Sequence, residues 1–389
     1  MNITLNDTIN KIYGEEKVNH AKEDIYRLWQ ECFGDSKEYT DFYFKWKVKD
    51  NQILTIYKKD SLCSMLHLNP YMLSIREQQV PVNYIVGVAT KMEERRQGLM
   101  KLLLERALHQ MPLTYLMPAA EAIYSPYDFR VVYEQEPWNK IMKATINNIG
   151  EPHNGVLNCK NIRVKSLRAD DKVSIEELTI FCNGILSQEY DIYVNRTPYY
   201  YERLIQEMES GFGEVLVCYK DNQIIGYVSY MAEDMIYITE MITGLNDKEA
   251  VLQVLGAYYE KNIKKEMYED KEHKITTIMV RIVDFRSFVK AFTVEEEMHI
   301  TMKVVDDIIQ ENNGIYHLNF TKDGCQITTT TKEPEITLSI ADVASIFFGR
   351  LKIDDIMKQD GTSSSCNKET IDKLYKINKL TKVFINDVV

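Results

Sequence analysis

One stretch, from Val82 to Ala107, constrains the fold of this chain more than any other. It begins with apolar, largely β-branched residues up to Ala89, which predict a buried strand. It ends with apolar residues at helical spacing after Gly98, which predict an amphipathic helix. A charged turn, EERRQG, joins the two. The first N–H groups of a helix have no intrahelical acceptor and lie at its positive end, so this turn predicts an anion site, to which Arg95 and Arg96 add positive charge.

The composition limits the class of protein. A length of 389 residues suggests about two to three domains. The net charge of -11 argues against general nucleic-acid binding and is compatible with a cationic partner such as an amine. No apolar run approaches the ~18 residues of a membrane span, and the N-terminus has no apolar core of a signal peptide. Seven scattered cysteines without a CxxC pair, and dispersed histidines, predict reduced thiols, a cytoplasmic location and no metal site.

Upstream of the central stretch, the sequence predicts two helices and a hairpin. The helices are Glu23 to Phe33 and Glu38 to Trp46, and the second carries aromatic residues that are more typical of a core than of a ligand site. Ile53 to Lys58 and Cys63 to Leu68 predict the hairpin, and a further strand, Leu113 to Met117, follows the central helix. The predicted order is helices, antiparallel strands, then strand, turn, helix and strand.

After a turn-rich linker at Glu151 to Gly155, a shorter version of this plan returns. It consists of a hairpin about the turn at 220–222, a strand over Met235 to Ile242 and a helix over Lys248 to Lys261. The crossover Ile242 to Leu245 contains no arginine. This second unit therefore lacks the anion-binding spacing of the first.

The last part of the chain predicts a third unit of strands and helices. Ile275 to Val283 is a strand that leads out of the second unit. Asn313-Gly314 is a two-residue hairpin signal that follows the strand Met298 to Asp306. The remaining predicted elements are strands over Ile315 to Phe320 and Ile336 to Ile340, and helices over Ala341 to Phe348 and Lys368 to Lys379.

The central turn resembles the acyl-CoA loop of the GNAT superfamily of N-acetyltransferases. That loop has the pattern Gln/Arg-x-x-Gly-x-Gly/Ala, and the chain has Arg95-x-x-Gly98-x-Met100, with Met100 in place of the small residue. Downstream, Tyr124 takes the place of the tyrosine that protonates the leaving CoA thiolate in many members, and Asp128 replaces the usual glycine before Phe129. A simpler interpretation stays open, with an ordinary solvated basic turn and a packed core tyrosine.

The whole pattern resembles the enhanced intracellular survival (Eis) family of bacterial acetyltransferases. The likeness extends over Gly87 to Leu99, Ile123-Tyr124, Met279 to Asp284, and Phe348-Gly349 with the following Asp354 to Ile356. It implies an α/β and α+β fold class: tandem GNAT acyltransferase folds, each a mixed, mostly antiparallel sheet with helices, and a C-terminal sterol-carrier-protein-like α+β domain. The implied domains are 1–150 (acetyl-CoA binding), 155–288 (a degenerate GNAT-like unit) and 289–389.

The resemblance also implies roles for residues at matching positions. It implies a general acid at Tyr124 and a general base at the terminal carboxylate of Val389. Asp35 and Trp46 lie where the family binds its acceptor, and matching Trp46 needs a one-residue insertion. The implied acetyl-CoA contacts are the pantetheine-binding Val88, Ala89 and Thr90, and the pyrophosphate-binding Arg95, Arg96, Gln97 and Gly98 with the adjacent Leu99 and Met100.

These roles predict acetyl transfer from the cosubstrate acetyl-CoA to a primary amine by direct attack in a ternary complex, without a metal. The acceptor stays open among aminoglycoside-like, polyamine and lysine amines. One alternative is a ping-pong route through an acetylated cysteine. Another is a non-catalytic protein that binds acyl-CoA or lipid and has a regulatory role. The family resemblance further implies a homo-oligomer, typically a hexamer.

Overall fold

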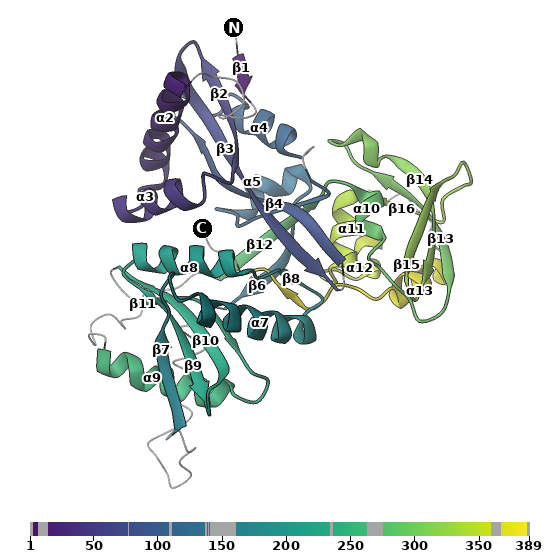
Figure 1. Cartoon of the computed structure of the whole chain (residues 1–389). Coiled ribbons are helices and arrows are strands. Elements are labelled where there is room, and N and C mark those ends of the chain that lie inside the picture. The colour runs from purple at the N-terminus through teal and green to yellow at the C-terminus, as the bar shows by residue number, and fades with distance from the viewer. Residues whose placement is uncertain are drawn as a thin grey trace.

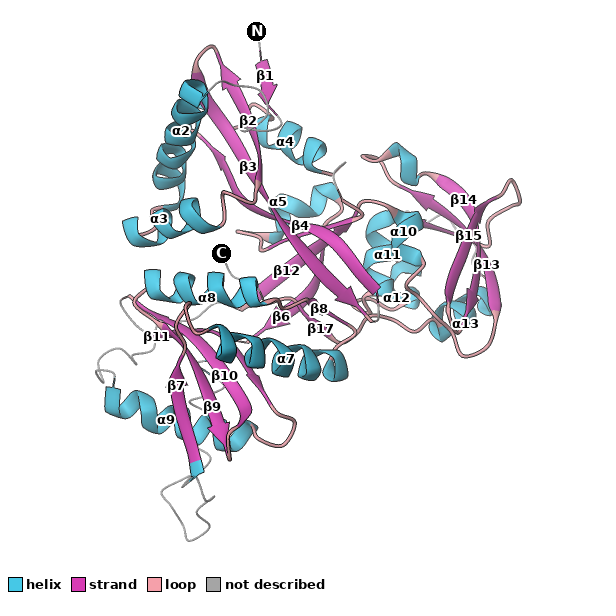
Figure 2. Cartoon of the chain, in the orientation of Figure 1, coloured by secondary structure: helices cyan, strands magenta, loops and turns pink. Residues whose placement is uncertain are grey.

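The computed structural model describes residues 3–6, 15–76, 78–108, 111–136, 138, 140, 161–233, 236–262, 275–358 and 367–386 (Figure 1). Within these residues the strands form three sheets, shown in magenta in Figure 2. Buried side chains from all three parts of the chain join in one continuous apolar cluster, which runs from Ile25 to Ile385. The three parts of the chain therefore share one hydrophobic core, and none of them has a separate core of its own in this cluster.

The first sheet has nine strands within the described residues, in the order β1-β2-β3-β4-β5-β12-β6, with β8 beside β3 and β17 beside β8. The strands are β1 (Ile3–Asn6), β2 (Gln52–Lys58), β3 (Ser61–Ile75), β4 (Gln78–Thr90), β5 (Leu113–Leu116), β6 (Arg130–Gln135), β8 (Ile192–Val194), β12 (Thr276–Ile282) and β17 (Val383–Phe384). The predicted hairpin is β2–β3, which pairs antiparallel as expected.

Helices cover both faces of this first sheet. On one face lie α2 (Glu15–Phe33) and α3 (Lys37–Trp46), whose apolar side chains pack with Tyr84 and Val86 of β4. On the other face lie α4 (Leu99–Ala107) and the short α5 (Glu121–Tyr124), which pack with Ile85 of the same strand. Alternate residues of β4 thus point to opposite faces, as its apolar run requires of a strand buried on both sides.

The strand over 276–282 contributes to the first sheet, although it follows the second unit in the sequence. It is β12, and it pairs antiparallel with β5 and with β6. The short strand β8 likewise pairs with β3. Both strands therefore pair with strands of the N-terminal sheet, although their residues belong to the predicted unit 155–288.

The second sheet has the order β11-β10-β9-β7 and carries helices on both faces. Its α9 packs on one face, while α7 and α8 pack on the other, against the first unit (Figure 2). The predicted hairpin joins β9 to β10, and Asp221 and Asn222 adopt the positive φ angles (49° and 66°) that tight hairpin turns use. The elements are β7 (Ile162–Ser166), β9 (Glu214–Lys220), β10 (Gln223–Ala232), β11 (Ile236–Thr243), α7 (Lys172–Glu189), α8 (Pro198–Ser210) and α9 (Lys248–Asn262).

The third sheet has the order β15-β14-β13-β16 and packs on α11, which also contacts β12 and β6. The helix predicted to end at Gly349 is α11, and Gly349 has φ 66°. The elements are α10 (Phe285–Val289), β13 (Met298–Val305), β14 (Gly314–Thr321), β15 (Gly324–Thr329), β16 (Ile336–Ser339), α11 (Ile340–Phe347), α12 (Ile353–Met357) and α13 (Lys368–Lys376).

The hairpin signal at Asn313-Gly314 was wrong about the turn, although β13 and β14 do pair antiparallel. Asn313 has φ -68° and ψ 128°, which is extended backbone, and the connection between the strands spans several residues. The Asn313 amide bonds the backbone of Asp306 at both groups, accepting from its N–H at 3.0 Å and donating to its carbonyl at 2.6 Å. The side chain closes a wider loop, so no two-residue turn forms.

Candidate active site

The parting of β4 and β5 sets up the candidate site. The two strands pair in parallel from Val82–Leu113 to Ile85–Leu116, where β5 ends. Strand β4 continues to Thr90 with β3 as its neighbour. Alternate backbone groups between Ile85 and Thr90 therefore have no β5 partner within the described residues, and they are available to an extended ligand that enters between the two strands.

Gly87 produces a bulge in this extension of β4. Its φ is 61°, and the register with β3 shifts between Met65 and His67. A Cβ on Gly87 would lie 2.5 Å from Cζ3 of Trp29. Only glycine combines this left-handed backbone with so close a neighbour. The bulge turns the last residues of β4 away from the regular sheet.

The turn that follows β4 exposes the start of α4. Gly98 is the N-cap residue, with φ 77°, and a Cβ added to it would meet no atom within 4 Å. The first backbone bond of the helix runs from the Leu102 N–H to the Gly98 carbonyl at 3.2 Å, so the preceding N–H groups have no intrahelical acceptor. The side chains of Arg95, Arg96 and Gln97 are exposed around them. This arrangement provides N–H donors and positive charge for an anion.

A strand from the neighbouring hairpin holds the turn in place. Lys58 of β2 forms an ion pair with Glu94, and its Nζ donates to Oε1 of Gln97 at 2.6 Å. Arg95 folds back toward β4, and its Nε donates to the Thr90 carbonyl at 3.1 Å. The turn is therefore fixed against the sheet from two sides.

Tyr124 lies on the same face of the sheet as α4. Its side chain is 7% exposed and packs edge-on against Phe129, with ring centroids 6.0 Å apart. Leu99 belongs to the same apolar cluster, and Val88 and Met100 pack against it. Burial raises the pKa of Tyr124 to about 12. The structure thus brings four of the expected site residues, Val88, Leu99, Met100 and Tyr124, into one apolar cluster.

The two expected acceptor residues lie apart. Asp35 connects α2 to α3, and its Oδ2 accepts a hydrogen bond from the indole of Trp29 at 2.8 Å. Trp46 is the last residue of α3, eleven residues after Asp35, and Nζ of Lys49 lies 4.7 Å from its ring centroid. A helix rises 1.5 Å per residue, so the length of α3 puts about 15 Å between the two positions.

Trp29 and His67 were missed by sequence reasoning, although both lie against the Gly87 bulge. Trp29 stacks on Tyr43 with ring centroids 4.2 Å apart, and it is tilted against His67 at 5.4 Å. His67 is fully buried, and burial lowers its pKa to about 3, so the ring is neutral at physiological pH. The signal available in the sequence was the isolated glycine in an apolar strand, which marks a bulge or a close approach.

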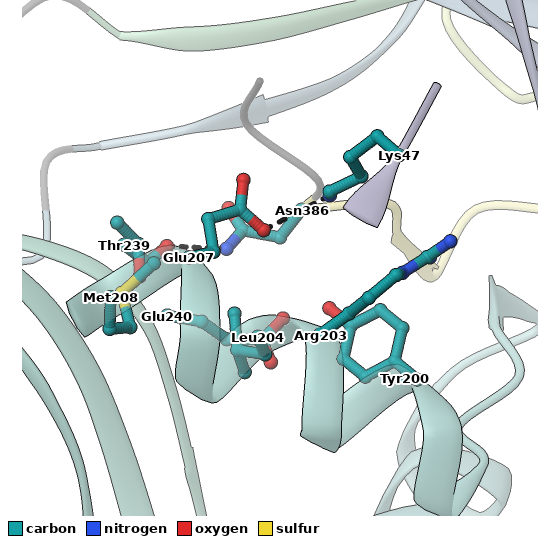
Figure 3. A pocket seen from close by; sticks show the side chains of 9 residues that line it. All are labelled: Lys47, Tyr200, Arg203, Leu204, Glu207, Met208, Thr239, Glu240 and Asn386. Carbon is teal, nitrogen blue, oxygen red and sulfur yellow. Dashed lines mark hydrogen bonds and ion pairs between the residues drawn. The ribbon is translucent and has the colours of Figure 1, made fainter. Parts of the chain in front are cut away.

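Val389 lies outside the described residues. The last described residue, Asn386, donates from its amide to the Thr239 carbonyl at 2.6 Å. It lines a small cavity, of about 20 Å³, between α8, β11 and the end of α3 (Figure 3). There Lys47 forms a buried ion pair with Glu207 at 3.0 Å. A cavity of this size holds about one water.

Within the described residues, no group of three His, Cys, Asp or Glu side chains is arranged to hold a metal ion. In the same part of the chain, no helix is both long enough and apolar enough to cross a membrane.

Comparison with known families identifies both ends of the chain. Residues 19–132 match the acetyltransferase (GNAT) domain, and residues 285–384 match the sterol carrier protein domain. No curated protein sequence matches the chain significantly. The chain therefore contains an acetyltransferase domain of the GNAT type and a C-terminal sterol carrier protein domain. A GNAT domain implies an acyl-CoA cosubstrate.

Solved structures share the fold over the full length of both chains. The three compared here are a probable N-acyltransferase from Enterococcus faecalis (14% identity, TM-score 0.73), a GCN5-related N-acetyltransferase from Anabaena variabilis (15%, 0.74) and Eis1 from Mycobacterium abscessus (13%, 0.67), each covering 100% of both chains. The expected architecture, with a GNAT fold and a sterol carrier protein domain in mixed sheets, is thereby confirmed, and the fold is Eis-like.

Proposed function

We propose that this protein transfers the acetyl group of acetyl-CoA to a primary amine by direct attack in a ternary complex. One observation carries the proposal: the exposed anion turn at Arg95–Gly98 and the largely buried side chain of Tyr124 lie on one face of the sheet, where β4 and β5 part. Acetyl-CoA, a pyrophosphate joined to a thioester by a long pantetheine arm, needs an anion site, an extended backbone partner and a proton donor. The chain offers the extended backbone partner in β4, the anion site at the start of α4 and the proton donor at the end of α5.

In this proposal acetyl-CoA contacts the residues that the sequence analysis predicts. Backbone groups of Val88, Ala89 and Thr90 bind the pantetheine arm, because an amide-bearing arm can extend the sheet where β5 stops. The pyrophosphate binds at the turn: N–H groups at the start of α4, from Gly98 to Met100, and the side chains of Arg95, Arg96 and Gln97 hold it. Acetyl-CoA supplies the acetyl group as an activated thioester.

The reaction requires two proton transfers, one from the attacking amine and one to the departing sulfur. The attacking amine must lose a proton, because an ammonium has no lone pair. As the new C–N bond forms and the C–S bond breaks, the departing sulfur takes a proton, which Tyr124 supplies. Burial raises the pKa of Tyr124 to about 12. The same apolar surroundings raise the pKa of a thiol beside it, so the pKa values of the phenol that donates the proton and of the thiol that forms stay comparable.

The proposed base is the terminal carboxylate of Val389. Support comes from the position of Asn386 between α8 and the end of α3, which are elements of two different units. A C-terminal tag or a truncation should abolish acetylation and leave acetyl-CoA binding largely intact. Unchanged turnover in the tagged protein would refute this base.

The proposed acceptor is a primary amine of aminoglycoside, polyamine or lysine type. Asp35 is the proposed anionic contact, because the Trp29 hydrogen bond fixes its carboxylate beside the aromatic cluster at the Gly87 bulge. Trp46, at the far end of α3, would contact a more distant part of an extended acceptor. Asp35→Asn should raise the KM of the amine and leave that of acetyl-CoA unchanged.

A ping-pong route through a cysteine is less well supported. Cys32 lies beside the end of β4, with Sγ 3.8 Å from the Thr90 carbonyl oxygen. Burial raises the pKa of its thiol, so it is a weak nucleophile at neutral pH. Cys159 and Cys366 lie outside the described residues.

The experiment that tests the function is thiol release from acetyl-CoA against a panel of amines, with binding of acetyl-CoA measured in parallel by calorimetry. We expect amine-dependent thiol release. Tight binding of acetyl-CoA with no turnover on any amine would favour the alternative, a non-catalytic acyl-CoA or lipid-binding regulator.

We further propose the division into 1–150, 155–288 and 289–389, with β8, β12 and β17 returning to the first sheet, and a homo-oligomer in solution, a hexamer by family resemblance. Light scattering of the purified protein tests the oligomer directly, because a monomer mass would contradict it.

A further inference from the structure

The turn that follows Tyr124 has an unusual backbone. A short 3-10 turn, η2 (Ser125–Tyr127), leads to Asp128, which has φ 62°. Asp128 stands where GNAT proteins usually have glycine, and aspartate is among the few other residues that tolerate this left-handed region. The Asp128 N–H closes the turn by donating to the Ser125 carbonyl at 3.1 Å. The position of the Tyr124 ring is therefore coupled to this turn.

Arg281 of β12 holds the turn in place through its guanidinium group. It is fully buried, and its Nε donates to the Tyr127 carbonyl at 2.9 Å. Its Nη2 lies 3.5 Å from Oδ2 of Asp128 and 2.7 Å from Oδ1 of Asp306. Its Nη1 donates to the carbonyl of Ile282. One guanidinium thus bonds the tyrosine-bearing turn, its own strand and the third unit.

Asp306 is itself held by the third unit. Its Oδ1 accepts from the N–H groups of Ile308 and Ile309 at 3.0 and 2.9 Å, and its Oδ2 accepts from the Asn312 amide at 2.8 Å. The loop after β13 therefore fixes this carboxylate independently of its contact with Arg281. Ile309 also belongs to the apolar cluster that contains Tyr124. The third unit is therefore linked to the turn after Tyr124 through Arg281, and it shares the apolar cluster of Tyr124 through Ile309.

We infer that Arg281 is a positioning residue for Tyr124, and that the sterol carrier protein domain sets this position through Asp306. The inference rests on the proposed role of Tyr124 as proton donor. A guanidinium can bond the Tyr127 carbonyl and two carboxylates at once because its donors form a rigid fork, whereas an ammonium cannot reproduce that geometry. A shift of about 1 Å in a reacting group can cost on the order of 100-fold in rate.

The test is a set of double-mutant cycles in the full-length protein. Arg281→Lys and Asp128→Asn are each made alone and together with Tyr124→Phe, and kcat and the KM for acetyl-CoA are measured by thiol release with an amine that the wild type acetylates. We expect Arg281→Lys to lower kcat by roughly 30-fold and Asp128→Asn by roughly fivefold, with that KM within about twofold of wild type. In the Tyr124→Phe background, each should lower kcat by less than about twofold, because residues that act as a unit are not additive.

Asp307→Asn is the matched control. It removes the same charge from the residue next to Asp306, and Asp307 is exposed with no hydrogen bond or ion pair to Arg281 among the described residues. Its kcat should equal that of wild type. Asp128→Asn keeps the test valid if Arg281→Lys does not fold, since asparagine also adopts the left-handed backbone.

Two different results overturn the inference. If Tyr124→Phe is slow and the other substitutions keep their full effect in that background, Arg281 does not act through Tyr124, and the proposed acid stands. If Tyr124→Phe has wild-type kcat, the proposed acid itself fails, and the positioning role fails with it.

Discussion

Gly87→Ala should disrupt both the stability of the first sheet and the binding of acetyl-CoA. An alanine at φ 61° costs about 1–2 kcal/mol relative to glycine. Its Cβ would lie 2.5 Å from Cζ3 of Trp29. The Trp29 ring cannot move freely, because Asp35 accepts its hydrogen bond at 2.8 Å and Tyr43 stacks on it. Overpacking of a buried ring costs about 1–3 kcal/mol, so the expected total loss is about 3 kcal/mol.

The assay is urea unfolding followed by tryptophan fluorescence, with acetyl-CoA affinity from calorimetry. Two of the three tryptophans, Trp29 and Trp46, lie on helices that cover the first sheet, so the signal reports on this unit. Acetyl-CoA affinity should fall at least about tenfold, since the bulge orients the last residues of β4. The control is Gly184→Ala in α7, where a Cβ meets no atom within 4 Å, and which should stabilise by about 0.5–1 kcal/mol. Wild-type stability and affinity in Gly87→Ala would refute the bulge as the organising feature.

Three further changes test other parts of the fold. Glu207→Gln should destabilise by about 3–5 kcal/mol in urea unfolding, because it leaves the buried charge of Lys47 without its carboxylate; a loss below about 1 kcal/mol would contradict this. His67 has a pKa of about 3 when folded and about 6.5 when unfolded, so the unfolded state binds the extra proton between these values and stability falls as pH falls from about 6.5 to about 3, by up to ~1.4 kcal/mol per pH unit. This slope should shrink in His67→Gln, and an unchanged slope would place the titration elsewhere. Ser339→Ala should cost about 1 kcal/mol in thermal unfolding, because it removes the capping box of α11, whereas an unchanged melting temperature would show that the cap is dispensable.

The local elements of the first unit were predictable because their information is local. The strand, the turn and the helix from Val82 to Ala107 follow from apolar spacing and from one glycine, and they correspond to β4 and α4. The hairpin turn at 220–222 was predictable for the same reason, since Asp221 and Asn222 tolerate the required positive φ.

The long-range pairing was not predictable from these patterns. A strand such as β12 has an apolar run that suits any buried position, and nothing in it specifies β5 and β6 as neighbours. The turn signal at Asn313 failed because the asparagine side chain bonds Asp306, a contact that depends on the wider loop. The contacts of Arg281 belong to the same class, because its partners Tyr127 and Asp306 are distant in sequence.

The candidate site was predictable in part. The residues from Val88 to Met100 and Tyr124 come from segments that flank the end of the short β5, so their sequence order leads to one place. Asp35 lies just before α3 and Trp46 at its end, so a match to the family at each position does not by itself place the two side chains in one pocket.

The measurement that tests the central claim most directly is kcat of Tyr124→Phe beside wild type, with acetyl-CoA affinity measured by calorimetry. Removing the hydroxyl leaves the ring packed against Phe129 and takes away only the proton donor. We predict a loss of roughly 100-fold or more in kcat, about 2.7 kcal/mol of barrier, with acetyl-CoA affinity unchanged. A kcat within about threefold of wild type would contradict the account, because Tyr124 would then be a packed core tyrosine and another group would protonate the leaving sulfur.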